Sequence, residues 1–73
     1  MAENIIYPKI TLAAARVNAG LTQQQLADTL GVDKSTVYSW ENGKGVPNAN
    51  HLRKISELSQ IPMDYIFVPS KTD

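Results

Sequence analysis

The sequence contains no cysteine, which excludes disulfide bonds and thiolate metal sites. Its one histidine has no second histidine or cysteine with which to hold a metal ion. No apolar run approaches the roughly 20 residues that a membrane-spanning helix needs, and the N-terminus does not follow the signal-peptide pattern. We therefore expect a soluble, cytoplasmic protein that binds no membrane, metal, cofactor or small-molecule ligand.

An excess of charge is also missing, since seven basic and seven acidic residues give a net charge of zero. Nucleic-acid-binding domains usually carry excess positive charge, so such a function has to be argued from local arrangement. No carboxylates cluster beside the histidine, which leaves no general base, nucleophile or metal cage. The sequence therefore predicts that the protein is not an enzyme.

The chain does have the composition of one small globular domain. It has 73 residues, of which 42% are hydrophobic and 19% charged. A chain of this length buries only about 60% of its unfolded surface, which leaves room for one thin core. We expect an N-terminal arm at residues 1–8, a folded domain at 9–68 and a polar tail at 69–73.

Two helices are predicted in the first half of the chain. The first runs from Lys9 to Ala19 and stops at Gly20, and its predicted buried stripe consists of Ile10, Ala13, Ala14 and Val17. Leu12 lies off this stripe. The second begins after Thr22, where a glutamine three residues later completes a capping box, and ends at Gly31. Its predicted core residues are Leu26, Ala27 and Leu30.

A third helix is predicted from about Lys34 to Asn42, with Asp33 as the N-cap. At 100° per residue, Asp33, Trp40 and Glu41 fall on the side of Val37. The opposite side is polar and carries Ser35, Tyr38, Ser39 and Asn42. Two short capped helices joined by a glycine turn are typical of a helix-turn-helix.

The rest of the chain predicts two more helices and no strand. One extends from about Ala49 to Gln60 after the cap Asn48, with His51 on its solvent side and with Leu52, Ile55 and Ser56 inward. The last is short and runs from Pro62 to Phe67. The predicted fold class is therefore all-α, with five helices.

The stretch LTQQQLADTLGVDKSTVYSWENGKGVPN resembles the helix-turn-helix of lambda-repressor-like proteins, the phage Cro and xenobiotic-response-element (XRE) transcriptional regulators. The resemblance covers roughly residues 9 to 67, and its marks are Arg16, Leu21-Thr22-Gln23, Leu26-Ala27, Gly31-Val32, Val37, Trp40-Glu41-Asn42-Gly43 and Pro47. It implies a compact five-helix DNA-binding domain whose third helix enters the major groove.

The resemblance also implies roles for individual residues. The implied DNA-binding residues are Gln23, Lys34, Ser35, Thr36, Tyr38, Ser39, Asn42 and Lys44. Arg16 and Glu41 correspond to a structural ion pair of the family. Without the resemblance, Ser35 and Ser39 would be interpreted as ordinary surface residues. Gln23 would be explained equally well as a solvated residue or as a DNA contact.

Four apolar or aromatic residues in a row near the C-terminus suggest a dimer contact formed by Tyr65, Ile66 and Phe67. The alternative is that Ile66 and Phe67 fill the core. Arg16, Lys34 and Lys44, with Lys9 as a fourth candidate, are expected on or near the DNA side, and such a small patch predicts that two subunits bind together.

The function predicted from these observations is a sequence-specific regulator of transcription that binds a double-stranded DNA operator as a homodimer. Repression by blocking the polymerase is the simplest mechanism, and a prophage or mobile element is a natural source of so small a regulator. The alternative is an antitoxin-like module whose C-terminal segment covers a toxin.

Overall fold

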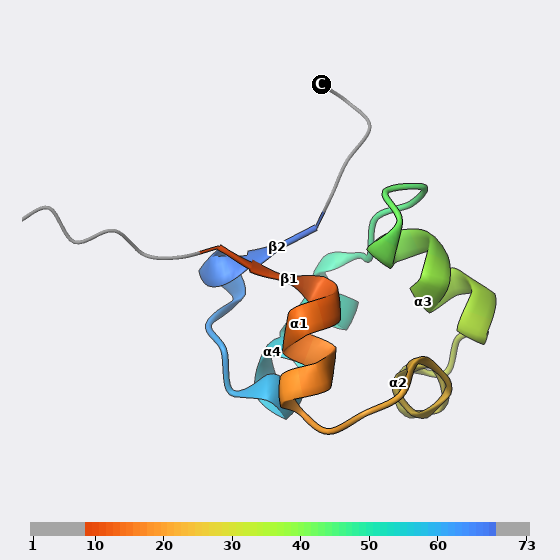
Figure 1. The fold of residues 1–73 in the computed structure, drawn as a ribbon, viewed down its shortest axis with the longest axis horizontal. Helices are drawn as coiled ribbons and strands as arrows, with labels where there is room; N and C mark the ends of the chain where they lie inside the picture. Colours follow the sequence, from red (N-terminus) through yellow and green to blue (C-terminus); the bar gives the residue numbers. More distant parts are fainter. Residues whose placement is uncertain (1–8, 69–73) are drawn as a thin grey trace, which may run out of the picture.

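The structure is a computed structural model that describes residues 9–68, so the expected arm at 1–8 and tail at 69–73 lie outside the described residues. The described part is mostly helical (Figure 1). Its elements, in chain order, are β1 (Ile10–Thr11), α1 (Leu12–Asn18), α2 (Gln23–Leu30), α3 (Lys34–Glu41), α4 (Ala49–Ser59), the 3-10 helix η1 (Met63–Tyr65) and β2 (Ile66–Phe67).

Helix α1 buries a different face from the predicted one, and it starts later. Thr11 is its N-cap, and the threonine hydroxyl accepts a 3.0 Å hydrogen bond from the backbone N–H of Ala14. Leu12 and Ala15 are fully buried, whereas Val17 is 63% exposed. The predicted stripe was therefore wrong: α1 packs through the face that carries Leu12 and Ala15, and Ile10 reaches the core from the strand that precedes the helix.

The C-terminal segment is not the predicted fifth helix. Only Met63–Tyr65 forms a turn of 3-10 helix, and Ile66–Phe67 then runs as an extended strand. This strand, β2, pairs in parallel with β1, and Ile10 lies opposite Ile66 (Figure 1). The expectation of no strand was therefore also wrong, because pairing with a segment more than 50 residues away satisfies backbone groups that a local pattern does not reveal.

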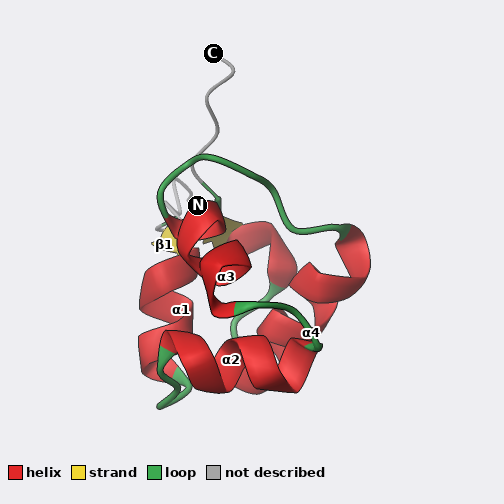
Figure 2. Cartoon of the chain, turned by 90° about the vertical axis from the view of Figure 1, so that its right-hand side faces the viewer, coloured by secondary structure: helices red, strands yellow, loops and turns green. Residues whose placement is uncertain are grey.

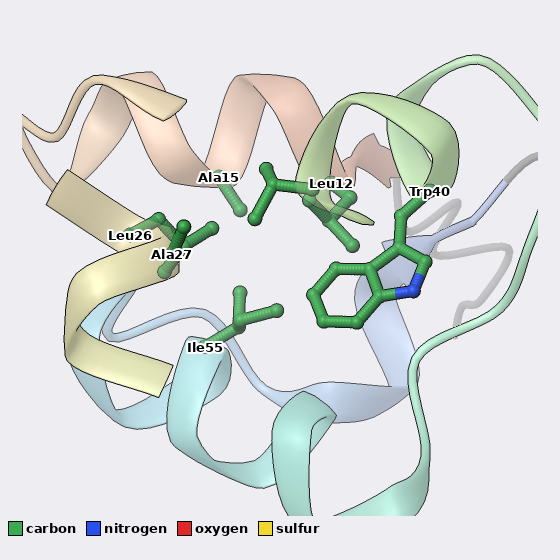
Figure 3. Packing of buried hydrophobic residues seen from close by; sticks show 7 residues of the cluster. Leu12, Ala15, Leu26, Ala27, Trp40 and Ile55 are labelled. Carbon is green, nitrogen blue, oxygen red and sulfur yellow. The ribbon is translucent and has the colours of Figure 1, made fainter. Parts of the chain in front are cut away.

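The core lies where four helices meet, and Figure 3 shows its side chains converging from all of them. It consists of Leu12 and Ala15 from α1, Leu26 and Ala27 from α2, Val37 and Trp40 from α3, and Ile55 from α4. Ile10 and Ile66 pack against this cluster from the two strands. The small sheet therefore closes one end of the helical bundle.

His51 is not on the solvent side of α4, contrary to the prediction. Its ring centroid lies 5.2 Å from that of Trp40, and its Nδ1 atom is buried. The backbone N–H of His51 donates to the side chain of the N-cap Asn48 at 2.8 Å. Because the cap fixes the first turn of α4, this turn holds the imidazole against the indole.

Candidate nucleic-acid interface

Helices α2 and α3 form the helix-turn-helix on one side of the bundle, and Figure 2 views the molecule from that side. The capping box at the start of α2 is complete: Gln25 N–H donates to the Thr22 hydroxyl, and the Thr22 N–H donates to the Gln25 side chain. Gly31 ends α2 with φ +73°, the left-handed conformation that an L side chain rarely adopts. The turn is therefore fixed by the local sequence.

Helix α3 has the two faces that its sequence predicts. Val37 is fully buried and Trp40 is 5% exposed, so the inner face anchors α3 in the core. On the outer face, Tyr38 is 53% exposed and Ser35 is also exposed. The anchored helix thus presents a polar surface to solvent from a rigid base.

The structure divides the eight sequence-predicted DNA contacts into two groups. The exposed group consists of Lys34, Ser35, Tyr38, Asn42 and Lys44. The half-buried group consists of Gln23, Thr36 and Ser39. The backbone N–H of Lys44 donates to the Ser39 carbonyl oxygen at 2.8 Å, so the loop that follows α3 stays close to the helix.

An ion pair between Arg16 and Glu41 ties α1 to the end of α3. The Nε of Arg16 donates to Oε2 of Glu41 at 2.7 Å, and Nη2 donates to Oε1 at 3.4 Å. Their side chains are only 16% and 7% exposed, respectively. Because the pair is largely shielded from water, it belongs to the architecture of the helix-turn-helix.

Two further hydrogen bonds extend this pair, and the sequence did not predict either. Arg16 Nη1 donates to the Leu21 carbonyl oxygen at 2.8 Å, which holds the segment between α1 and α2. Gln23 Nε2 donates to Glu41 Oε1 at 2.9 Å. The carboxylate of Glu41, at the end of α3, therefore holds the side-chain amide of Gln23 in place. The spacing of residues in the sequence does not predict this contact.

These contacts change the balance of charge on this side of the molecule. The guanidinium of Arg16 is engaged by Glu41 and by a backbone carbonyl, which leaves little of it for another anion. Lys34 and Lys44 are exposed and form no ion pair among the residues that the structure describes. Lys9 lies beside the sheet, with its Nζ 5.7 Å from the centroid of the Phe67 ring.

The prediction that the carboxylate of Asp33 caps α3 was wrong. It occupies the N-cap position of α3, but its side chain makes no capping hydrogen bond. The backbone carbonyl of Asp33 accepts instead from the N–H of Thr36 at 2.9 Å. Asp33 is exposed at the N-terminus of α3.

The three residues predicted as a dimer contact have unequal environments. Ile66 is half-buried and packs against the core, and Tyr65 is also half-buried. Phe67 is 42% exposed and Met63, four residues earlier in the chain, is 38% exposed. The exposed apolar surface of this segment is therefore formed by Phe67 and Met63.

Within residues 9–68, no three histidine, cysteine, aspartate or glutamate side chains gather closely enough to hold a metal ion. None of the helices in the same range is both long and apolar enough to span a membrane.

Comparison with known proteins identifies the same motif. The sequence profile of the helix-turn-helix family matches residues 12–66. Over 53 residues the chain is 40% identical to the HTH-type transcriptional activator BcrR of Enterococcus faecalis, covering 73% of this chain and 26% of that protein. Over 56 residues it is 34% identical to the cryptic phage CTXphi transcriptional repressor RstR of Vibrio cholerae, covering 77% of this chain and 50% of that protein.

The chain therefore spans a quarter to a half of the length of these curated relatives. No solved structure matches it significantly.

Proposed function

The chain belongs to the helix-turn-helix family, and from this membership we propose that it is a sequence-specific, double-stranded DNA-binding regulator of transcription. The observation that carries the proposal is the arrangement of α3. Val37 and Trp40 fix its inner face in the core, while Ser35 and Tyr38 stand exposed on the opposite face and Lys34 is exposed at its first residue. A helix anchored in this way has the shape and polarity that the major groove of B-DNA admits.

In this proposal the outer face of α3 reads base edges. Lys34 donates to guanine O6 and N7, and Ser35 and Ser39 pair with several bases or act through water. Thr36 and Tyr38 lie near the bases or the adjoining backbone. Since the two serines are short, direct discrimination by this face is limited, and sequence-dependent DNA shape contributes to specificity.

The residues around α3 position it on the phosphate backbone. Gln23 begins α2, where backbone N–H groups attract anions, and the bond to Glu41 holds its side chain beside the end of α3. Lys44 and Asn42 follow α3 and supply a cation and an amide. Such contacts fix the register of a protein on DNA without reading sequence.

We propose further that the protein acts as a repressor by occupying an operator and excluding the polymerase. RstR is described as a phage repressor and BcrR as an activator, so the relatives support regulation of either sign. Repression requires only binding, whereas activation also requires a surface for the transcription machinery. A small helix-turn-helix unit whose exposed polar face binds DNA is therefore enough for repression.

We also propose that the protein binds DNA as a homodimer. Lys34 and Lys44 are two exposed cations per protomer, a small number for phosphate binding, and pairing doubles it. The exposed Phe67 and Met63 offer apolar surface for the contact. Phe67→Asp should weaken pairing, which light scattering measures with and without operator DNA, while the fold remains helical by circular dichroism.

The test of DNA reading is selection of bound duplexes from a random pool, followed by binding measurements on the selected sequence. Lys34→Ala combined with Ser39→Ala should retain the helical fold but lose discrimination between the selected and a scrambled duplex. Lys54→Ala is the matched control, because it removes a cation that pairs with Glu57 on α4. Unchanged discrimination in the double variant would show that α3 does not read the bases.

A further inference from the structure

Glu41 accepts three hydrogen bonds, and one of them comes from a residue of the proposed DNA-binding surface. Two donors belong to Arg16, whose Nε and Nη2 bind Oε2 and Oε1 at 2.7 and 3.4 Å. The third is Nε2 of Gln23, which donates to Oε1 at 2.9 Å. The side chain of Glu41 is only 7% exposed. A nearly buried carboxylate therefore links the first residue of α2 to the last residue of α3.

This carboxylate decides which way the amide of Gln23 is turned. An ionised carboxylate only accepts hydrogen bonds, so it binds the amide nitrogen and repels the amide oxygen. The nitrogen carries two N–H groups, and Glu41 uses one of them. Within residues 9–68 the second N–H donates to no other group. The amide thus keeps one donor, attached to a nitrogen that a buried group holds in place.

Two features of the pair make this donor suitable for an anion. The guanidinium of Arg16 offsets the negative charge of Glu41, so the carboxylate does not repel a nearby phosphate as a lone anion would. Glutamine also has many rotamers in solution, and a side chain that is already held loses less freedom when it binds. Gln24 lacks this support, because it is exposed and donates to Asp28 on its own helix.

We infer that Glu41 is a positioning residue for DNA binding, which holds the amide of Gln23 so that its remaining Nε2–H donates to one backbone phosphate of each half-site. The inference rests on the proposed function. A charged phosphate oxygen accepts such a bond strongly, whereas an amide oxygen turned toward the phosphate would repel it. Glu41 therefore acts on DNA through Gln23, without touching the DNA itself.

The experiment replaces single phosphates of the selected duplex by uncharged methylphosphonate and measures the loss of affinity at each position. The proteins compared are the parent, Gln23→Ala, Glu41→Gln and the double variant of the last two. Gln24→Ala is the matched control, since it removes the neighbouring amide. Circular dichroism checks that each protein is folded at the temperature of the assay. If Glu41→Gln does not fold, Arg16→Met with Glu41→Leu replaces it, because this pair removes the carboxylate without leaving a lone cation.

The expected result is a coupling between Gln23 and one phosphate that depends on Glu41. In the parent and in Gln24→Ala, methylphosphonate at that phosphate should weaken binding at least about fivefold more than it does in Gln23→Ala. The losses at the other phosphates should be the same in all three proteins. Without the carboxylate of Glu41, Gln23→Ala should change the loss at that phosphate by less than about twofold.

Two results would overturn the inference while the proposed function stands. If Gln23→Ala has the same losses as the parent at every phosphate, Gln23 does not bind the backbone. If the coupling of Gln23 to its phosphate persists without the carboxylate, and binding is weakened equally at all positions, Glu41 only stabilises the fold. A parent that selects no duplex from the random pool overturns the inference and the proposed function together.

Discussion

Replacing Glu41 with leucine tests the central claim that one carboxylate holds the helix-turn-helix together. In the parent, Oε1 and Oε2 of Glu41 accept hydrogen bonds from Arg16 at 3.4 and 2.7 Å, and Oε1 also accepts from Gln23 at 2.9 Å. Leucine has similar bulk but accepts no hydrogen bond. The variant therefore leaves a cation without its partner in a largely enclosed position.

The size of the effect follows from how far the pair is shielded. Removing one partner of a fully buried ion pair costs about 3–5 kcal/mol. Arg16 is 16% exposed and keeps its bond to the Leu21 carbonyl, so we expect a loss of about 2–3 kcal/mol in the free energy of unfolding. In a domain this small, that corresponds to a fall in Tm of roughly 8–24 °C.

Urea denaturation followed by the fluorescence of Trp40, the only tryptophan, measures this loss. The double variant Arg16→Met with Glu41→Leu should recover most of it, because no unpaired charge remains. Glu57→Leu is the control, since Glu57 is 62% exposed and its contact with Lys54 is 3.8 Å long. We expect that variant to stay within about 0.5 kcal/mol of the parent.

Two results would refute the reasoning. A loss below about 1 kcal/mol for Glu41→Leu would mean that solvent readily replaces the carboxylate. A double variant less stable than Glu41→Leu alone would mean that Arg16 stabilises the fold chiefly through its other contact.

Three further predictions concern the core, the turn and the DNA complex. Trp40→Ala should lose about 3–5 kcal/mol by opening a cavity between α3 and α4, measured by urea denaturation with circular dichroism; a loss below about 1 kcal/mol would contradict the indole's role as anchor. Gly31→Ala should cost about 1–2 kcal/mol from its positive φ alone, since an added Cβ meets no atom within 4 Å, and Gly31→Asn should cost less. If Lys34 and Lys44 are the phosphate contacts of each protomer, log affinity against log salt should have a slope near −3.6 for a dimer, whereas a slope near −1.8 would indicate a monomer.

The helix-turn-helix itself was readable from the sequence because its signals are local. A hydroxyl and a glutamine three residues apart predicted the capping box at Thr22, and a glycine after the last apolar residue predicted the left-handed end of α2. The spacing of Val37 and Trp40 predicted the buried face of α3. Each of these signals acts within one or two turns of helix, so neighbouring residues alone decide them.

The buried face of α1 could not be predicted from the sequence, because two sets of apolar residues recur with the same helical spacing. Ile10, Ala13, Ala14 and Val17 form one, and Leu12, Ala15 and Ala19 form the other. The α1 sequence does not say which one meets the other helices. Packing chose the stripe that contains Leu12, and pairing of Ile10 with Ile66 removed Ile10 from the helix altogether.

By itself the sequence therefore determined where the central helices begin and end, which side of α3 faces the core, and which family the chain resembles. Only the tertiary structure decided that Gln23 is bound by Glu41, that His51 packs on Trp40, that Asp33 keeps a free carboxylate, and that the last segment is a strand. The difference has one physical reason. Caps and periodicity depend on groups a few residues apart, whereas these contacts depend on how whole helices pack, which segments pair and which side chains remain free.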